Sequence, residues 1–154
     1  MIIGATADGV RIEADDEVAA FLVRLPDMLE HVDPDEEAAR RLAPPVYLDD
    51  EEANEEWWGY MEGELTRGRS DDRKIFRSVM RSASESSGVE LSREEAHALA
   101  RVVTELRLVM AARLGIRTED DYDELALEDR ALLDVLAGVQ MGVLTALEHD
   151  GVPE

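Results

Sequence analysis

The residues best suited to metal chemistry are a glutamate and a histidine three positions apart, Glu94 and His97. Carboxylate-bridged di-iron sites in helical bundles use a Glu-x-x-His pair on each of two helices and a further glutamate on each of two others. Only one tetrapeptide fits this spacing, because His31 and His149 each follow a glutamate directly. Such a tetrapeptide arises easily by chance in an acidic chain, so we expect no metal site and no cofactor.

Sequence motifs for other reaction classes are missing. The chain has no Gly-x-Gly-x-x-Gly or Gly-x-x-x-x-Gly-Lys phosphate loop and no nucleophile elbow. It has no cysteine, which excludes disulfides, thiolate nucleophiles and cysteine-containing metal sites. Carboxylates are abundant, but a general acid needs a pKa raised by burial, and these acids are expected to be solvated. The sequence gives no positive sign of an enzyme, and catalysis stays an open question.

Polar residues within apolar helix faces are the more informative candidates. Gln140 projects among the leucines and valines of the last predicted helix, and Arg107 and Arg113 border the apolar face of the helix before it. Buried amides and guanidinium groups need hydrogen-bond partners, such as backbone groups and a carboxylate at Asp49 or Asp50. We expect a structural polar network that fixes the helix register, with a ligand or subunit-contact site as the alternative.

Both tryptophans lie in the most acidic stretch, residues 51–64, EEANEEWWGYMEGE. At helical spacing Trp57 or Trp58, Met61 and Leu65 share one stripe, and most of the acids fall outside it. We expect the tryptophans to anchor the core and the acids to form a solvated face. Adjacent side chains on a helix point 100° apart, so one tryptophan should be partly exposed, which leaves a partner-binding aromatic as the alternative.

A basic stripe follows on the next helical stretch, formed by Arg67, Lys74, Arg77 and Arg81. These residues recur at helical spacing opposite an apolar face. We expect a solvated face that offsets nearby acid, and a docking surface for a partner is the alternative.

The elements that would position these residues are mainly helical. Residues 2–13 form two β-prone runs around Asp8-Gly9, a dipeptide expected to supply positive φ for a hairpin turn, and residues 88–92 repeat the Gly-Val pattern of a candidate third strand. Helices are expected after Asp15 or Asp16 with a break at Pro26, between the Asp33-Pro34 and Pro44-Pro45 pairs, and from Asp49 or Asp50.

The C-terminal half is expected to contain the clearest helix of the chain, which should be central, and a last apolar helix. A helical pattern resumes beyond Gly68, and a serine-rich loop covers residues 82–88. Ser92 and Glu95 form a capping box that opens a central helix ending at Gly115, where Ile116 folds back in a Schellman ending. An acidic loop from residue 118 to about 124 precedes the last helix. The fold class is therefore mainly α, a bundle-like single domain over residues 1–150 with an N-terminal β-hairpin and a frayed tail at 151–154.

Length and charge limit the partners. The chain has 154 residues and a formal net charge of -21, which would repel a phosphate backbone. We expect no direct nucleic-acid binding. The sequence shows no export leader and no apolar run near bilayer length, so we expect a cytoplasmic protein that does not bind a membrane. Self-association stays open.

Three stretches resemble the bacterial domain-of-unknown-function family DUF2017. They are PVYLDDEEA at residues 45–53, LRLVMAARLG at 106–115 and VQxxVL at 139–144. In that family a Tyr-x-x-Asp, an Arg-Leu with an Arg-Leu-Gly, and a glutamine in the last helix recur. The resemblance marks Tyr47, Asp50, Arg107, Arg113 and Gln140 here. It implies a small cytosolic protein of a family whose genes often lie near that of the Clp protease adaptor, with no established activity.

Two hypotheses follow. The first is a non-enzymatic regulatory or adaptor protein that binds another protein through the tryptophans or the basic stripe, with a role in regulated proteolysis or the stress response suggested by the gene neighbourhood. The second is a small-molecule- or metal-binding enzyme centred on Arg107, Gln140 and nearby carboxylates. For Arg107 and Gln140 we expect a buried, mainly architectural role, tying the last two long helices to the segment around Tyr47 and Asp50.

Overall fold

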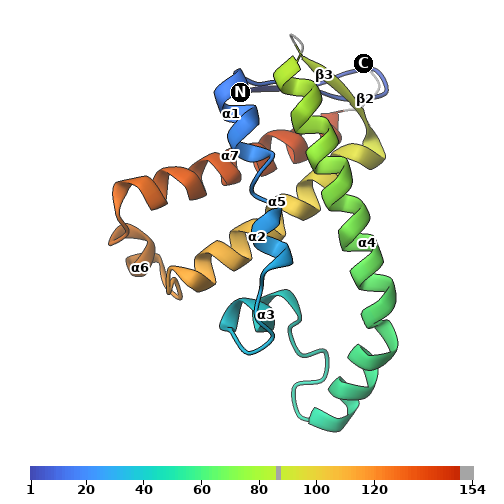
Figure 1. The fold of residues 1–154 in the computed structure, drawn as a ribbon, viewed down its shortest axis with the longest axis vertical. Helices are drawn as coiled ribbons and strands as arrows, with labels where there is room; N and C mark the ends of the chain where they lie inside the picture. The colour runs from blue at the N-terminus through green and yellow to red at the C-terminus, as the bar shows by residue number, and fades with distance from the viewer. Residues whose placement is uncertain (86–87, 150–154) are drawn as a thin grey trace.

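Seven helices and one small sheet make up the part of the chain that the computed structural model describes, residues 1–85 and 88–149. The predicted fold class, mainly α with an N-terminal hairpin, is confirmed. Figure 1 shows the sheet at one end of the molecule and the long helices below it. The elements are β1 (Ile2–Ala5), β2 (Gly9–Glu13), α1 (Asp16–Leu22), α2 (Asp27–Glu30), α3 (Glu37–Leu42), α4 (Glu51–Glu85), β3 (Val89–Ser92), α5 (Arg93–Arg113), α6 (Glu119–Asp123) and α7 (Leu127–His149).

The sheet is antiparallel in the order β1-β2-β3, so the predicted hairpin and third strand are both confirmed. The central strand β2 pairs with both neighbours, and its Val10 faces Ala5 on one side and Leu91 on the other. Val10 and Ile12 are fully buried. Alternate residues of a strand point to one face, so these two side chains both point to the face of the sheet that packs against the helices.

The reason for glycine at position 9 differs from the prediction. Neither Asp8 nor Gly9 has a positive φ, so the expected left-handed turn is wrong. The chain instead reverses over residues 6–8, and the Thr6 N–H donates to the Gly9 carbonyl. A Cβ at Gly9 would lie 1.9 Å from the Leu91 carbonyl oxygen of β3. Glycine is needed here because the third strand approaches this backbone too closely for any side chain.

Local sequence signals set the short elements. The helix predicted after Asp15 is split at Pro26 into α1 and α2, because proline has no amide proton to donate within a helix. The short helix between the two proline-containing pairs is α3. Residues 118–124, expected to be a loop, contain α6, because Thr118 and Asp121 form a capping box that the prediction missed.

Helix α5 is the central element and contacts α7, α4 and α3. The predicted capping box is present at its start, where the Glu95 N–H donates to Ser92 Oγ and the Ser92 N–H donates to Glu95 Oε1. At its end Gly115 has a φ of 72°, and the Ile116 N–H donates to the Ala111 carbonyl. These bonds form the expected Schellman ending, which turns the chain toward α6.

Helix α4 is longer than predicted. Its 35 residues run through Gly68 without a break, and its end at Glu85 takes in most of the stretch expected to be a serine-rich loop. A glycine within a helix costs about 1 kcal/mol relative to alanine, which weakens the helix but does not stop it. Residues 86–87 of that stretch and the tail 151–154 lie outside the described residues.

The core lies where α5, α7 and the second half of α4 meet under the sheet. Fully buried side chains include Phe76 of α4, Leu106 of α5 and Leu136 of α7. Helix α7 is long and apolar enough to cross a bilayer by length and composition, so the statement that no stretch approaches that length is wrong. A core helix passes the same test, and Leu133, Leu136 and Val143 of α7 are buried against the rest of the chain.

Candidate functional site

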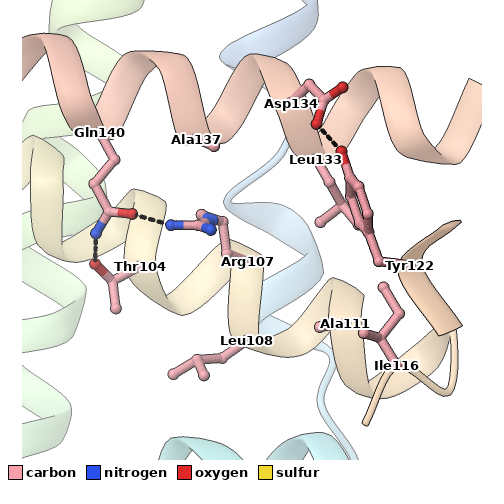
Figure 2. A pocket seen from close by; sticks show the side chains of 10 residues that line it. All are labelled: Thr104, Arg107, Leu108, Ala111, Ile116, Tyr122, Leu133, Asp134, Ala137 and Gln140. Carbon is pink, nitrogen blue, oxygen red and sulfur yellow. Dashed lines mark hydrogen bonds between the residues drawn. The ribbon is translucent and has the colours of Figure 1, made fainter. Parts of the chain in front are cut away.

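A groove runs between α5 and α7 and forms a cavity of about 530 Å³. Its α5 wall carries Thr104, Arg107, Leu108 and Ala111, which share one face because they lie three, four and seven positions apart. Its α7 wall carries Leu133, Asp134, Ala137 and Gln140, and Ile116 and Tyr122 close the end nearest α6. Figure 2 shows these side chains from close by.

A chain of hydrogen bonds crosses this groove at one end. Arg107 Nη1 donates to Gln140 Oε1 over 2.5 Å, and Gln140 Nε2 donates to Thr104 Oγ1 over 2.5 Å (Figure 2). The Thr104 hydroxyl donates in turn to the Ala100 carbonyl at 3.0 Å. The amide of Gln140 therefore has both of its ends bonded, which fixes the side of Arg107 that faces α7.

Arg107 and Gln140 tie α5 to α7 as expected, but the expected burial is wrong. Arg107 is exposed and Gln140 is half-buried. Within residues 1–85 and 88–149 no carboxylate lies within 4 Å of the Arg107 guanidinium, and its only hydrogen bond is to Gln140. Arg107 is thus a cation held by a neutral amide at the mouth of a partly apolar groove.

The other end of the groove carries a second polar pair. The Tyr122 hydroxyl donates to Asp134 Oδ1 (Figure 2), and this bond is the first cause of a raised pKa for Tyr122. Arg130 lies over the Tyr122 ring at 5.5 Å from its centroid and donates to the Asp123 carbonyl. The groove therefore has an arginine at one end and a bonded carboxylate at the other.

Tyr47 and Asp50 do not line this groove, and their hydrogen bonds are made within the segment that leads into α4. The Tyr47 N–H donates to Asn54 Oδ1, and Asp50 Oδ1 accepts from the Ala53 N–H at 3.0 Å. Asp50 is therefore the N-terminal cap of α4, which satisfies one of the free amides at the helix start. The prediction that these two residues join Arg107 and Gln140 in one network is wrong.

Arg113 also acts elsewhere. Its Nε donates to Glu36 Oε1 at 3.0 Å, and its Nη2 donates to the His31 carbonyl at 3.2 Å. The hydrogen bond from Arg113 is the first cause of a lowered pKa for Glu36, followed by the Asp33 N–H. This pair fastens the end of α5 to the chain between α2 and α3.

The tryptophans are not core anchors, contrary to the prediction. Trp57 and Trp58 are both half-buried, stack edge to face at 4.9 Å between centroids, and do not belong to the core cluster. No residue of α4 before Asp72 is buried. Figure 1 shows this first half of α4 extending away from α5 and α7, with the segment from α3 running back beside it.

We call residues 46–65 the acidic arm. The arm exposes Leu48 at 86% and Tyr60 at 89% of their surface, and Val46 and Tyr47 at about half. Its eight carboxylates are all exposed, and it contains no lysine or arginine; the acids are Asp49, Asp50, Glu51, Glu52, Glu55, Glu56, Glu62 and Glu64. Two shallow hollows flank the tryptophans, one beside Trp57, Tyr60 and Met61 and one beside Trp58 and Leu65.

The predicted basic stripe is partly used within the fold. Arg77 Nη2 bonds Asp27 Oδ1 at 2.9 Å and Glu30 Oε1 at 2.7 Å, which fastens α4 to α2. Arg67 Nε donates to the Gly63 carbonyl of its own helix. Lys74 and Arg81 are exposed. The stripe is therefore not a continuous free surface.

Sequence reasoning missed a cluster of ion pairs between α4 and α5. Buried Asp72 accepts two hydrogen bonds from Arg101, at 2.8 and 2.9 Å. Buried Glu105 lies 3.4 Å from Arg69 and 3.6 Å from Arg73. Burial is the first cause of a raised pKa for Glu105, and the two arginines offset part of it. Its place between Val102 and Val109 on the apolar face of α5 was the signal that could have revealed it.

Glu94 and His97 are both exposed near the start of α5. Among the described residues no three histidine, aspartate or glutamate side chains are grouped to hold a metal ion.

The comparisons with known proteins give one result. No curated protein and no solved structure matches the chain. A family model described as a domain of unknown function (DUF2017) matches residues 3–147. Because this match spans nearly the whole chain, the chain belongs to that family.

Proposed function

We propose that this member of the DUF2017 family is a non-enzymatic adaptor that binds another protein through the acidic arm. The single observation that carries the proposal is that α4 holds both tryptophans on a half that has no buried residue. Tryptophan and tyrosine are enriched among the residues that contribute most of the binding energy at protein interfaces. The arm therefore has an apolar stripe like that of a core helix, but no other described element of the chain buries this stripe.

The charge of the arm defines the partner as a basic amphipathic helix. Eight exposed carboxylates surround the aromatic stripe, and lysine and arginine are missing from residues 46–65. A helix with leucines on one face and lysines or arginines on its flanks would place apolar anchors against Trp57, Trp58 and Met61 and its cations beside the acids. The helical part of the arm is about 22 Å long at 1.5 Å per residue, enough for four turns of such a partner.

The same charges argue against other occupants. Nucleic acids and the anionic face of a membrane carry the same sign as the arm and would be repelled. A second copy of the arm would place like charges opposite each other, which is unfavourable at close range.

The position of the tryptophans allows binding to the arm to be tested by fluorescence. Both tryptophans of the chain are in the arm, so tryptophan fluorescence, excited where tyrosine does not absorb, reports this segment alone. We would titrate the protein with a designed helix of leucine and lysine at amphipathic spacing, and with a peptide of the same composition in scrambled order. We expect a saturable change in tryptophan emission with the first peptide, weakened by added salt because the pairing is partly ionic.

A charge-matched pair of variants separates the arm from the overall field of the protein. Glu55→Lys with Glu56→Lys reverses two charges in the arm, and Glu119→Lys with Asp120→Lys reverses two exposed charges on α6. The first double variant should weaken peptide binding and the second should not. Equal binding of the scrambled peptide, or equal weakening by both double variants, would refute the proposal.

A role in regulated proteolysis or the stress response is a further proposal that rests on the gene neighbourhood of the family. The alternative, an enzyme centred on Arg107 and Gln140, is favoured by one observation, the open groove beside them. The groove supports binding more directly than catalysis, because the one carboxylate lining it, Asp134, is engaged by the Tyr122 hydroxyl.

A further inference from the structure

We infer that the groove between α5 and α7 binds a small monocarboxylic acid with an apolar chain, held by Arg107. This site is separate from the acidic arm and does not rest on the proposed function. Its volume of about 530 Å³ lies in the range of roughly 300 to 1,000 Å³ that is typical of small-molecule pockets.

The head of the ligand is defined by Arg107. One of its Nη atoms donates to Gln140, and within the described residues Nε and Nη2 have no hydrogen-bond partner. Guanidinium groups bind carboxylates through two parallel hydrogen bonds, which match two free donors on one edge. The bonds from Gln140 to Thr104 and from Thr104 to the Ala100 carbonyl orient Arg107 before any ligand arrives.

The body of the ligand is defined by the floor of the groove. The lining outside the two polar ends is aliphatic and comes from Leu108, Ala111, Ile116, Leu133 and Ala137. Figure 2 shows Ala137 and Leu133 directed from α7 toward α5 across this stretch. A hydrocarbon chain placed there would leave water for an apolar surface, which is favourable at about 25 cal/mol for each Å² buried.

The far end limits the ligand to one acid group. Asp134 lines the groove there and accepts the Tyr122 hydroxyl proton in a hydrogen bond, so a second carboxylate would meet a like charge. A dicarboxylate is therefore disfavoured. An amine is disfavoured at the head, where it would face Arg107.

The net charge of the protein helps to distinguish specific binding of an acid from nonspecific ionic attraction. With a net charge of -21 it should attract cations and repel anions in a nonspecific way. Preference for an acid over the matching amine would therefore come from a local site and not from the overall field.

The probe is octanoate, compared with octanol and octylamine, and binding is followed by calorimetry and by amide chemical shifts. Gln140→Glu places a carboxylate on Arg107 with almost no change in shape, and Ala137→Leu fills the floor. Met141→Glu adds the same charge one residue along, on the exposed side of α7, and is the matched control.

We expect octanoate to bind at one site and to shift the amides of the lining residues. Gln140→Glu should weaken it by about tenfold to a hundredfold, the range for losing a charge-assisted hydrogen-bonded pair. Ala137→Leu should also weaken it, Met141→Glu should not, and octanol should bind more weakly. The inference is overturned if octanoate does not saturate, if Gln140→Glu binds it as the wild type does, if Met141→Glu weakens it equally, or if octylamine binds the groove more tightly.

Discussion

The two halves of α4 have the same backbone and different surroundings. Residues 72–85 contribute fully buried Phe76 and Met80 to the core, and α5 and α1 cover them. Residues 51–71 carry an apolar stripe of equal regularity, yet none of its members is buried. Hydrophobic periodicity predicts a helix and an apolar face, but it does not say what lies against that face.

The glycines of α4 are also divided unequally between its two halves. Gly59, Gly63 and Gly68 all lie in the first half, and a Cβ at any of them would meet nothing within 4 Å. Each costs helix stability without allowing any close approach of another segment. The first half of α4, which contains the helical part of the acidic arm, is therefore the less stable half of a continuous helix, and this suits a segment that binds a partner.

The largest expected effect on stability comes from replacing a methionine in each half of α4. Met80 is fully buried and Met61 is half-buried in the arm. Met80→Ala should lower the free energy of unfolding by about 2 to 5 kcal/mol, because it removes buried methylenes and leaves a cavity. Met61→Ala should change it by no more than about 1 kcal/mol.

Urea denaturation followed by circular dichroism measures both variants. Similar costs for the two methionines would mean that the arm packs as tightly as the core, and the contrast between the halves would fail.

Local signals and distant contacts explain what the sequence could predict. The strand pairing of the hairpin, the Pro26 break, the Ser92 capping box and the Gly115 ending depend on neighbouring residues, and these four are as expected. The burial of the tryptophans and of Arg107 depends on which helix lies opposite, which periodicity does not contain. The groove was anticipated only as an alternative, because its opening depends on how α5 and α7 pack against each other, which the pattern of either helix does not contain.

A pH effect of intermediate size is expected from the ion pairs beside the packed half. Burial raises the pKa of Glu105 above its unfolded value, which is about 4.3 for a glutamate. The stability that Glu105 contributes is therefore fully present below that value and is lost as the pH rises through the raised pKa. Glu105→Gln should remove this pH-dependent loss, so the free energy of unfolding should vary less with pH between about 4.3 and the raised pKa of Glu105.

Glu36 provides the opposite sign for comparison. Its pKa is lowered by the hydrogen bond from Arg113, so its contribution is present above about pH 4.3 and is lost as the pH falls through the lowered pKa. Glu36→Gln should reduce stability at neutral pH and have no effect in strong acid. Thermal melts across the pH range check both variants, and equal slopes for wild type and Glu105→Gln would contradict the first.

The smallest expected effect concerns the glycines. Gly63→Ala should stabilise helix α4 by about 0.5 to 1 kcal/mol, because alanine restricts the unfolded chain and meets no neighbour. Gly142→Ala gains the same propensity in α7, but its Cβ would lie 3.0 Å from Ile3 Cδ1. It should therefore gain less or lose stability. Circular dichroism and urea denaturation compare the two variants, and an equal gain at both sites would contradict the close contact between Gly142 of α7 and Ile3 of β1.

Hydrogen exchange of the backbone amides, with and without the basic amphipathic peptide, tests the central claim most directly. In the free protein we expect amides of residues 51–68 to exchange much faster than those of residues 72–85, because few contacts oppose local opening of the first half. The peptide should slow exchange in the arm and leave the packed half unchanged. Equal protection of both halves in the free protein, or protection by the peptide that falls outside the arm, would contradict the account.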